Sequence, residues 1–317
     1  MNSLTLHDRL MGGLIGVLVG DALGVPVEFS GREMRRQDPV LGMRGFGTWK
    51  QPAGTWSDDS SMTLVAADTL ATSGWHLPRM MEGFREWLDE NRWTAHGKVF
   101  DIGNATRNAI MLYRIHGDSE SCGQTHEKDN GNGSLMRFLP TSCWLFGRPI
   151  DEQVVAAGQA SALTHAHARA RWCCAWHTRW CDALLSGRDV REATLAANAA
   201  LRRYVPAAER SHVQRLLDAS VLDLPREAVI SGGYVVSTLE ASVWCLARHG
   251  TYAAAVLEAV NLGGDTDTTA AVTGGMAGLR AGLSQIPPEW IAALARRDEV
   301  LALANRFANA CIEQWQS

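Results

Sequence analysis

This sequence has no excess of positive charge, and it lacks the cysteine pairs typical of zinc knuckles and thiol-exchange motifs. Thirty Lys and Arg residues stand against 34 Asp and Glu residues, so the formal net charge is −4. This balance gives no electrostatic reason to expect nucleic acid or an anionic membrane as a partner. The seven cysteines include no CxxC pair, and free thiols in a reducing cytosol fit better than a disulfide framework. We therefore expect a cytoplasmic protein.

Long apolar runs are also missing. The run at 10–19 follows Arg9 and superficially resembles a signal peptide, but it is too short to span a bilayer and Asp21 interrupts its continuation. No cleavage site of small residues follows it, so we predict neither a signal peptide nor a membrane span. Linkers, repeats and low-complexity tracts are absent as well. We expect one domain over residues 1–317.

Strand signals are scarce, because no sustained alternation of β-branched residues is bounded by turns. Apolar residues instead recur at three- and four-residue spacing, in segments rich in Ala, Leu, Met and Arg. This pattern predicts an all-α fold, a single compact domain of many helices. The predicted helices are 60–73, 78–91, 104–116, 151–185, 190–204, 234–249, 252–262 and 288–314.

Glycine recurs every four residues near the start of the chain, at Gly12, Gly16, Gly20 and Gly24. Residues four apart lie on one face of a helix, so these glycines form a ridge without side chains. Glycine is costly in a helix interior and calls for a packing reason. We therefore predict that another helix packs closely against this face.

Two acidic clusters, at 54–60 and 261–269, each lie between a loop and the start of an Ala-rich helix. Each can be read as a helix N-cap followed by an acidic first turn. Capping needs only one side-chain oxygen, however, and each cluster supplies two carboxylates and several hydroxyls. Carboxylates packed so closely repel one another unless a cation neutralises them.

Taken together, the clusters offer an all-oxygen ligand set that suits Mg²⁺ or Mn²⁺. Aspartates that are adjacent or next but one can bridge two ions, so we predict two divalent cations, Mg²⁺ or Mn²⁺. The histidines show no HExxH spacing, which argues against zinc. The candidate metal ligands are Ser57, Asp58, Asp59, Asp265, Asp267 and Thr268.

The chain resembles the ADP-ribosylglycohydrolase family, whose motifs match in order from about Leu10 to Gly282. These motifs are 20–24 with Glu28, Trp-Ser-Asp-Asp at 56–59, the loop 130–134, Thr-His at 164–165 and Gly-Gly-Asp-Thr-Asp-Thr at 263–268. The resemblance implies a compact all-α fold with two Mg²⁺ or Mn²⁺ ions, bound by the same six residues. The family usually has Thr where Ser57 stands, and serine keeps the hydroxyl.

Two carboxylates compete for the catalytic role. The segment 100–104 resembles the stretch that carries the catalytic aspartate in bacterial members acting on ADP-ribosylarginine. The resemblance makes Asp101 the candidate acid/base or nucleophile and has Asn104 hold the ligand; the alternative for Asp101 is a helix N-cap. Members that cleave ADP-ribosylserine use a glutamate in the position of Glu28. Both residues are present, and the intact Asp-x-Gly-Asn stretch favours arginine.

Further residues are candidates for binding the ADP-ribose. A glycine-rich loop before an apolar helix exposes N–H groups that, with the positive end of that helix, can cradle a diphosphate, although most such loops are only turns. His165 lies in an Ala-rich, helical stretch, where a core or surface histidine is the ordinary interpretation; by resemblance it contacts the ADP-ribose. By resemblance Tyr234 packs against the nucleotide, and a core tyrosine is the alternative. The loop candidates are Asn130, Gly131, Gly133 and Ser134.

The resemblance implies metal-dependent hydrolysis of the bond between ADP-ribose and a protein side chain, with arginine the favoured linkage. The partner would be an ADP-ribosylated protein. Alternatives are serine-linked or other ADP-ribose derivatives, and a non-catalytic immunity protein that binds ADP-ribose or a toxin. A remote alternative is a Mg²⁺-dependent phosphohydrolase, because 265–269 looks like the DxDx[TS] motif of haloacid-dehalogenase-type phosphatases. That motif follows a buried strand in an α/β fold, which is not the pattern here.

Overall fold

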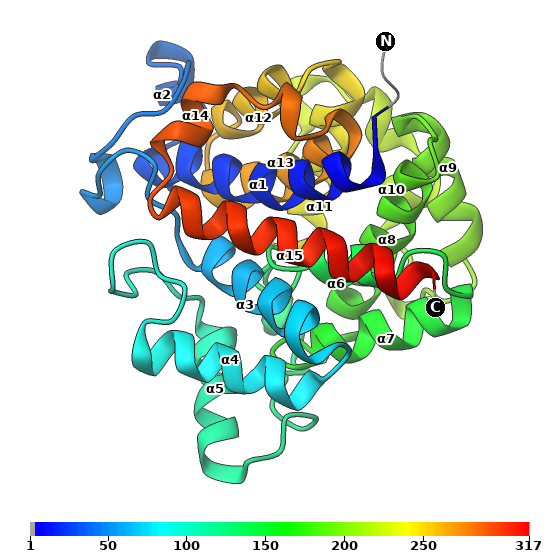
Figure 1. The fold of residues 1–317 in the computed structure, drawn as a ribbon. Coiled ribbons are helices and arrows are strands. Elements are labelled where there is room, and N and C mark those ends of the chain that lie inside the picture. The colour runs from blue at the N-terminus through cyan, green and yellow to red at the C-terminus, as the bar shows by residue number, and fades with distance from the viewer. Residues whose placement is uncertain (1–3, 317) are drawn as a thin grey trace.

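Helices make up 67% of the protein, and the computed structural model, which describes residues 4–316, contains no β-strand in that range. The predicted all-α domain is confirmed (Figure 1). The α-helices are α1 Leu6–Gly24, α2 Arg32–Gln37, α3 Asp58–Ser73, α4 Leu77–Glu90, α5 Asn104–His116, α6 Leu139–Trp144, α7 Ile150–Ala162, α8 Ala168–Leu185, α9 Val190–Leu201, α10 Gln214–Leu217, α11 Val235–Arg248, α12 Tyr252–Asn261, α13 Thr266–Ala281, α14 Pro288–Ala293 and α15 Arg297–Gln316. Short 3-10 turns join them: η1 Val25–Val27, η2 Gly47–Trp49, η3 Glu127–Asp129, η4 Ala207–Glu209, η5 Ser220–Asp223, η6 Arg226–Ala228 and η7 Leu283–Gln285.

The centre of the fold is the antiparallel contact between α1 and α13. A methyl group added to Gly16 would collide with the carbonyl oxygen of Gly274, and one added to Gly20 would collide with that of Ala270. The glycine ridge therefore packs backbone against backbone, as the four-residue spacing predicts. At its end, Gly24 lies against the backbone of Asp267. The close crossing thus brings the last turn of α1 beside the first turn of α13.

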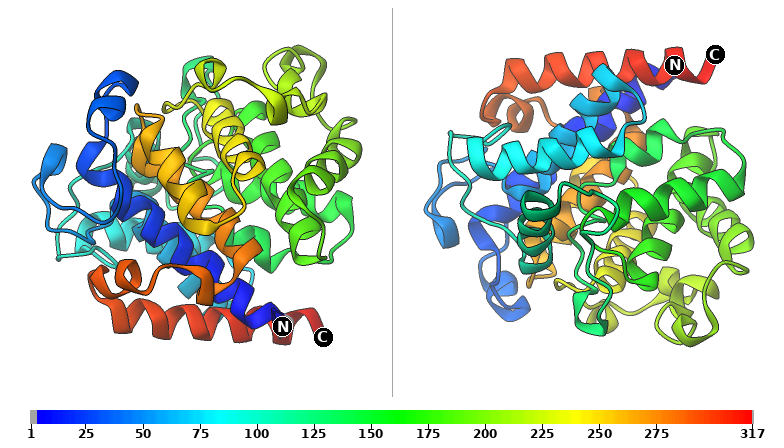
Figure 2. Two further views of the ribbon diagram at one scale, coloured as in Figure 1. Left: turned by 90° about the horizontal axis from the view of Figure 1, so that it is seen from above. Right: turned by 90° about the horizontal axis from the view of Figure 1, so that it is seen from below.

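The segment Leu6–Val27 is, by length and composition, apolar enough to cross a membrane. It is longer than the run at 10–19, so the length argument made from the sequence was wrong. The segment's most apolar window is fully buried inside the protein, which is the situation of a core helix. Its neighbours include α13 and α15, and α15, red in Figure 1, lies between α1 and α3. Figure 2 shows from two further sides that α15 covers the outside of the bundle.

The predicted helix 151–185 is broken, and His165 lies in the break between α7 and α8 rather than in a helix. The cause is a long-range pairing, in which the Gln124 N–H donates to the Thr164 carbonyl (3.3 Å) and the Ala166 N–H donates to the Gln124 carbonyl (2.9 Å). His167 then caps α8 through its side chain. The helical placement of His165 was therefore wrong, because local periodicity carries no trace of this pairing.

The predicted helix 288–314 is likewise divided, into α14 and α15. Between them the Ala295 N–H donates to the carbonyl of Gly54 (3.0 Å), in the loop that precedes α3. Arg296 adopts a positive φ of 47°, which no helix residue can keep. This contact ties the C-terminal helix to the loop of the first acidic cluster.

Candidate active site

Three helix ends meet at the acidic clusters: the C-terminal end of α1 and the N-terminal ends of α3 and α13. Ser57 is the N-cap of α3, since its hydroxyl accepts from the Asp59 N–H (3.3 Å). Asp265 stands at the N-cap of α13, but its side chain makes no capping hydrogen bond. The capping alternative therefore holds for Ser57 and fails for Asp265, while Asp58 and Asp267 lie in the first turns of their helices.

Asp21 holds the start of α3 in place. Its buried carboxylate accepts from the Ser57 N–H (3.0 Å), the Ser60 N–H (3.0 Å) and the Ser60 hydroxyl (2.5 Å). Burial raises the pKa of Asp21 to about 6, and these hydrogen bonds oppose the rise. The sequence analysis gave Asp21 no role, although a lone carboxylate within an apolar helix was a signal for one.

The candidate metal ligands of the two clusters meet across the helix ends. Asp59 Oδ2 accepts from the hydroxyls of Ser57 (3.1 Å) and Thr268 (3.2 Å), which joins α3 to α13. Carboxylate oxygens of Glu28, Asp265 and Asp267 lie within 4.8 Å of one another. Sequence segments more than 200 residues apart thus supply one group of oxygens.

This group fits a hard divalent cation. Within residues 4–316, Asp59 Oδ1 and Asp267 Oδ2 are buried and accept no hydrogen bond. Burial, and then the neighbouring carboxylates, raise the pKa of Asp58, Asp59 and Asp267 well above the ordinary range. Buried carboxylates with free oxygens are the ligands that Mg²⁺ and Mn²⁺ prefer. The acidic group is therefore a candidate site for such an ion.

A cavity of about 340 Å³ opens beside this group. Asp58, Asp265 and Thr268 of the clusters line this cavity. Ser57, Asp59 and Asp267 are buried and are not part of its lining. Its lining is Glu28, Phe29, Asp58, Asp101, Gly103, Asn104, Ala105, Thr106, Lys128, Asp129, Gly131, Asn132, Gly133, Met136, His165, Gly233, Asp265 and Thr268.

Asp101 lines the cavity from the segment that leads into α5. Gly103 is the N-cap of that helix, so Asp101 is not a capping residue and that alternative is excluded. Burial, and then the charge of Asp265, raise the pKa of Asp101. Asn104, the first residue of α5, is exposed and also faces the cavity.

Glu28, the rival carboxylate, lines the same cavity and is held by η2. The Trp49 indole N–H donates to Glu28 Oε2, and the Thr48 hydroxyl donates to the Glu28 carbonyl (2.8 Å). The Trp49 ring also packs on Phe100, next to Asp101, at 5.5 Å between centroids. Burial, and then Asp101, raise the pKa of Glu28 to about 8. The sequence pattern carried no signal that Trp49 links the two segments.

The glycine-rich loop contributes to the cavity only in part. Gly131 and Gly133 line it, together with His165. Asn130 and Ser134 do not: the Asn130 side-chain amide donates to the Glu127 carbonyl (2.9 Å), and the Ser134 hydroxyl, fully buried, accepts from Ser161 (3.0 Å).

The residue between the two glycines, Asn132, faces the site instead. Its side-chain amide donates to Asp265 Oδ2 (2.9 Å) and to the Thr238 hydroxyl (2.9 Å). Asn132 thereby connects the loop to the second acidic cluster. The sequence analysis quoted this residue in its motif and assigned it no role, because spacing alone does not show which way a loop residue points.

Tyr234 lies beside the cavity and is not part of its lining. It is the N-cap of α11, and it pairs with Gly131 through a single antiparallel bridge. The Arg169 guanidinium lies over its ring at 5.7 Å. Among the described residues the Tyr234 hydroxyl has no hydrogen-bond partner.

A second acidic group, formed by Glu127, His167 and Glu209, surrounds a cation that the protein itself supplies. Arg169 donates to Glu209 (2.6 Å) and to Glu127 (2.9 Å). The guanidinium neutralises these carboxylates, so this group needs no metal ion.

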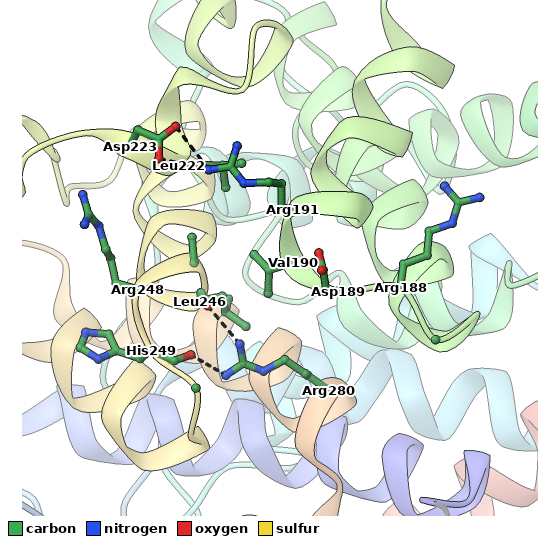
Figure 3. A pocket seen from close by; sticks show the side chains of 13 residues that line it. Arg188, Asp189, Val190, Arg191, Leu222, Asp223, Leu246, Arg248, His249 and Arg280 are labelled. Carbon is green, nitrogen blue, oxygen red and sulfur yellow. Dashed lines mark hydrogen bonds and ion pairs between the residues drawn. The ribbon is translucent and has the colours of Figure 1, made fainter.

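A larger hollow of about 630 Å³ lies between the start of α9 and the end of α11 (Figure 3). Two of its arginines already have partners: Arg280 donates to the carbonyls of Leu246 (3.0 Å) and His249 (2.8 Å), and Arg191 pairs with Asp223. It contains no carboxylate pair comparable with Glu28 and Asp101. The smaller cavity beside the acidic clusters is therefore the candidate active site.

The family model for ADP-ribosylglycohydrolases matches residues 2–317. The chain belongs to the ADP-ribosylglycohydrolase family. It is 33% identical over 302 residues to the ADP-ribosylarginine hydrolase Tri1 of Pseudomonas putida, covering 95% of this chain and 78% of that protein. It is 30% identical to the ADP-ribosyl-[dinitrogen reductase] glycohydrolase of Rhodospirillum rubrum, covering 94% of each.

A solved structure supports the same assignment. The structure titled "ADP-ribosylglycohydrolase-related protein complex" superposes with a TM-score of 0.81 at 30% identity, and the match covers 96% of this chain and 99% of that one. Family and fold agree, and the protein is a glycohydrolase.

Proposed function

We propose that the protein hydrolyses the bond between ADP-ribose and an arginine side chain of a modified protein, with two divalent cations, Mg²⁺ or Mn²⁺. The observation that carries this proposal is the cavity lined by Asp101 and Glu28, beside which Asp59 and Asp267 each have a buried oxygen that accepts no hydrogen bond within residues 4–316. Relatives named for ADP-ribosylarginine and for dinitrogen reductase support the substrate class. The proposed enzyme works in the cytoplasm.

The cations would be held by the six residues of the acidic clusters. When bound there, they supply Lewis acidity and a fixed charge that orients the ribose hydroxyls and a water molecule. The residues are Ser57, Asp58, Asp59, Asp265, Asp267 and Thr268.

Asp101 is the proposed catalytic residue. Its carboxylate stabilises the positive charge that develops on the ribose as the C1–N bond breaks. It also accepts the proton of the water that forms the new C1–O bond, and this proton then passes to the leaving guanidine. Burial raises the pKa of Asp101, which favours its holding that proton. Asn104, Gly131, Gly133 and His165 line the space for the rest of the ADP-ribose.

Hydrolysis of a serine linkage is the second candidate. It is favoured by one observation: Glu28 lines the same cavity and its carboxylate is fixed by Trp49. The phosphohydrolase alternative has no such support, because Asp265 begins a helix in an all-α fold instead of following a strand.

The deciding experiment measures ADP-ribose release from arginine-linked and serine-linked substrates, with Mg²⁺, with Mn²⁺ and with chelator. We expect metal-dependent release from the arginine linkage and a loss of about 100-fold or more in kcat for Asp101→Asn. The matched control is Asp223→Asn, at an exposed carboxylate in the other hollow, which should keep full activity. Release from the serine linkage alone, or full activity in Asp101→Asn with metal bound, would contradict the proposal.

A further inference from the structure

His165 is connected to a buried arginine through a single hydroxyl group. The Arg137 guanidinium donates to the Thr164 hydroxyl (2.8 Å), and that hydroxyl lies 2.7 Å from His165 Nδ1. The three residues come from two segments and are 3%, 0% and 2% exposed, respectively, so bulk water does not compete for these bonds. The hydrogen bonds among these three side chains therefore have to be formed within the group, without help from water.

The direction of the bonds follows from what each group can donate. A guanidinium only donates, so the Thr164 oxygen accepts from Arg137. The one other partner of this hydroxyl among the described residues is His165 Nδ1. If Nδ1 carried a hydrogen, the Thr164 hydroxyl hydrogen would be buried without an acceptor, which is costly. Thr164 therefore donates to a bare Nδ1, and the imidazole hydrogen is on Nε2.

Arg137 is held firmly enough to enforce this arrangement. Its guanidinium also donates to the Gly133 carbonyl and lies over the Phe84 ring at 4.7 Å. Burial lowers the pKa of Arg137 only to about 10, so the group stays charged at neutral pH. Burial, and then this charge, lower the pKa of His165 to about 3. The imidazole is consequently neutral, with a single N–H.

That N–H lies at the cavity wall between two glycines. A methyl group on Gly131 would lie 3.6 Å from Nε2, and one on Gly133 would lie 3.3 Å from it. His165 lines the cavity, and within residues 4–316 its Nε2 makes no hydrogen bond. Because glycine has no side chain, the loop leaves Nε2 open to a ligand.

We propose that Arg137 and Thr164 are positioning residues that fix His165 as the Nε2–H tautomer, so that its imidazole donates a hydrogen bond to an acceptor oxygen of the bound ADP-ribosyl group. The ligand identity rests on the proposed function, whereas the tautomer does not. His165 is then a fixed donor that takes no part in proton transfer.

The tautomer is tested first, by nitrogen NMR of the imidazole side chains in the metal-loaded, ligand-free protein, with His165→Gln to assign the signal. We expect a bare Nδ1 and a protonated Nε2. Thr164→Val should shift the signals toward a mixture of tautomers, and Thr164→Ser should keep the wild-type signals. A protonated Nδ1 in the wild-type protein overturns the proposal, whatever the stability of the variants.

Ligand binding is tested next, by calorimetry with ADP-ribose itself. We expect Thr164→Val to bind about tenfold more weakly, as for a lost hydrogen bond to a charged ligand, and Thr164→Ser to bind within about twofold of the wild type. Equal affinities of Thr164→Val and the wild type would overturn the role of the hydroxyl. Absence of ADP-ribose binding by the wild-type protein, with the expected tautomer present, would instead contradict the proposed function.

Discussion

At the scale of single residues, the site contains aspartates with opposite tasks. Asp21 accepts hydrogen bonds from Ser57 and Ser60 through both carboxylate oxygens and does not line the cavity. Asp59 and Asp267 each have a buried oxygen without a hydrogen-bond partner in the part of the chain that the structure describes. A carboxylate saturated by donors positions the chain, and one left unsaturated is available to a cation. The same residue type therefore anchors the start of α3 at Asp21 and offers a free oxygen to a cation at Asp59 and Asp267.

Asp21→Asn should destabilise the protein and weaken its cation site. An amide cannot accept from both N–H groups and the Ser60 hydroxyl as the carboxylate does. With Mg²⁺ present at pH 8, above the pKa of about 6 for Asp21, we expect the free energy of unfolding to fall by about 2 kcal/mol or more. Urea unfolding measures this loss, and Mg²⁺ titration should show weaker binding. Asp223→Asn should change neither quantity, and equal stability of Asp21→Asn and the wild type would refute the bracing role.

Residues of the site were predictable where the chemical type and the spacing of the side chains identify them. Closely spaced carboxylates and hydroxyls indicated a cation, and the structure places Asp58, Asp59 and Asp267 together. The direction of a loop side chain was not predictable in this way. Ser134 was expected at the ligand and is buried in the core, and Asn132 was given no role and bonds to Asp265. Only the folded backbone decides which residue of the loop faces the cavity.

At the scale of elements, the contact of α1 with α13 positions the site. Backbone contact at Gly16 and Gly20 sets how far each helix extends past the other. The four-residue spacing of glycine predicted this contact, because the signal is periodic and local. The break at His165 was not predicted, since it depends on pairing with Gln124, a residue distant in sequence. Local patterns thus predicted most of the long helices and the packing face of α1, and long-range contacts decided where the predicted helices 151–185 and 288–314 are broken.

Gly16→Ala should weaken the fold strongly. In most helices this change is favourable by up to about 1 kcal/mol, but here the added methyl group would collide with the carbonyl of Gly274. We expect a loss of about 3 kcal/mol or more in the free energy of unfolding, as for overpacked cores. Gly250→Ala is the control, because no heavy atom lies within 4 Å of an added methyl group there. Denaturant unfolding of both variants checks the prediction, and a stable Gly16→Ala protein would show that the helices can separate at no cost.

At the scale of the whole molecule, the acidic group would couple the proposed cation binding to folding. Its carboxylates come from both ends of the chain and are buried next to one another, so the metal-free fold has to hold protons that the unfolded chain releases. The pKa of Asp21 rises from 3.8 to about 6 and that of Glu28 from 4.5 to about 8, in each case mainly by burial. Such groups stabilise the fold below about pH 4, and this stability is lost as the pH rises through about 8.

Stabilisation by Mg²⁺ should therefore grow as the pH rises from about 4 to about 8. A bound cation favours the ionised carboxylates and so removes the loss of folding stability that the metal-free protein suffers at high pH. Each pKa unit corresponds to about 1.4 kcal/mol in the free energy of unfolding. His165 and His177, whose pKa burial lowers to about 3, act in the opposite sense below pH 6.5. They contribute equally with and without the cation, so the difference between the two unfolding curves isolates the acidic group. Urea unfolding in Mg²⁺ and in chelator, at matched ionic strength, should show this difference increasing by about 3 kcal/mol or more. A difference that stays constant with pH would mean that the cation binds away from these carboxylates.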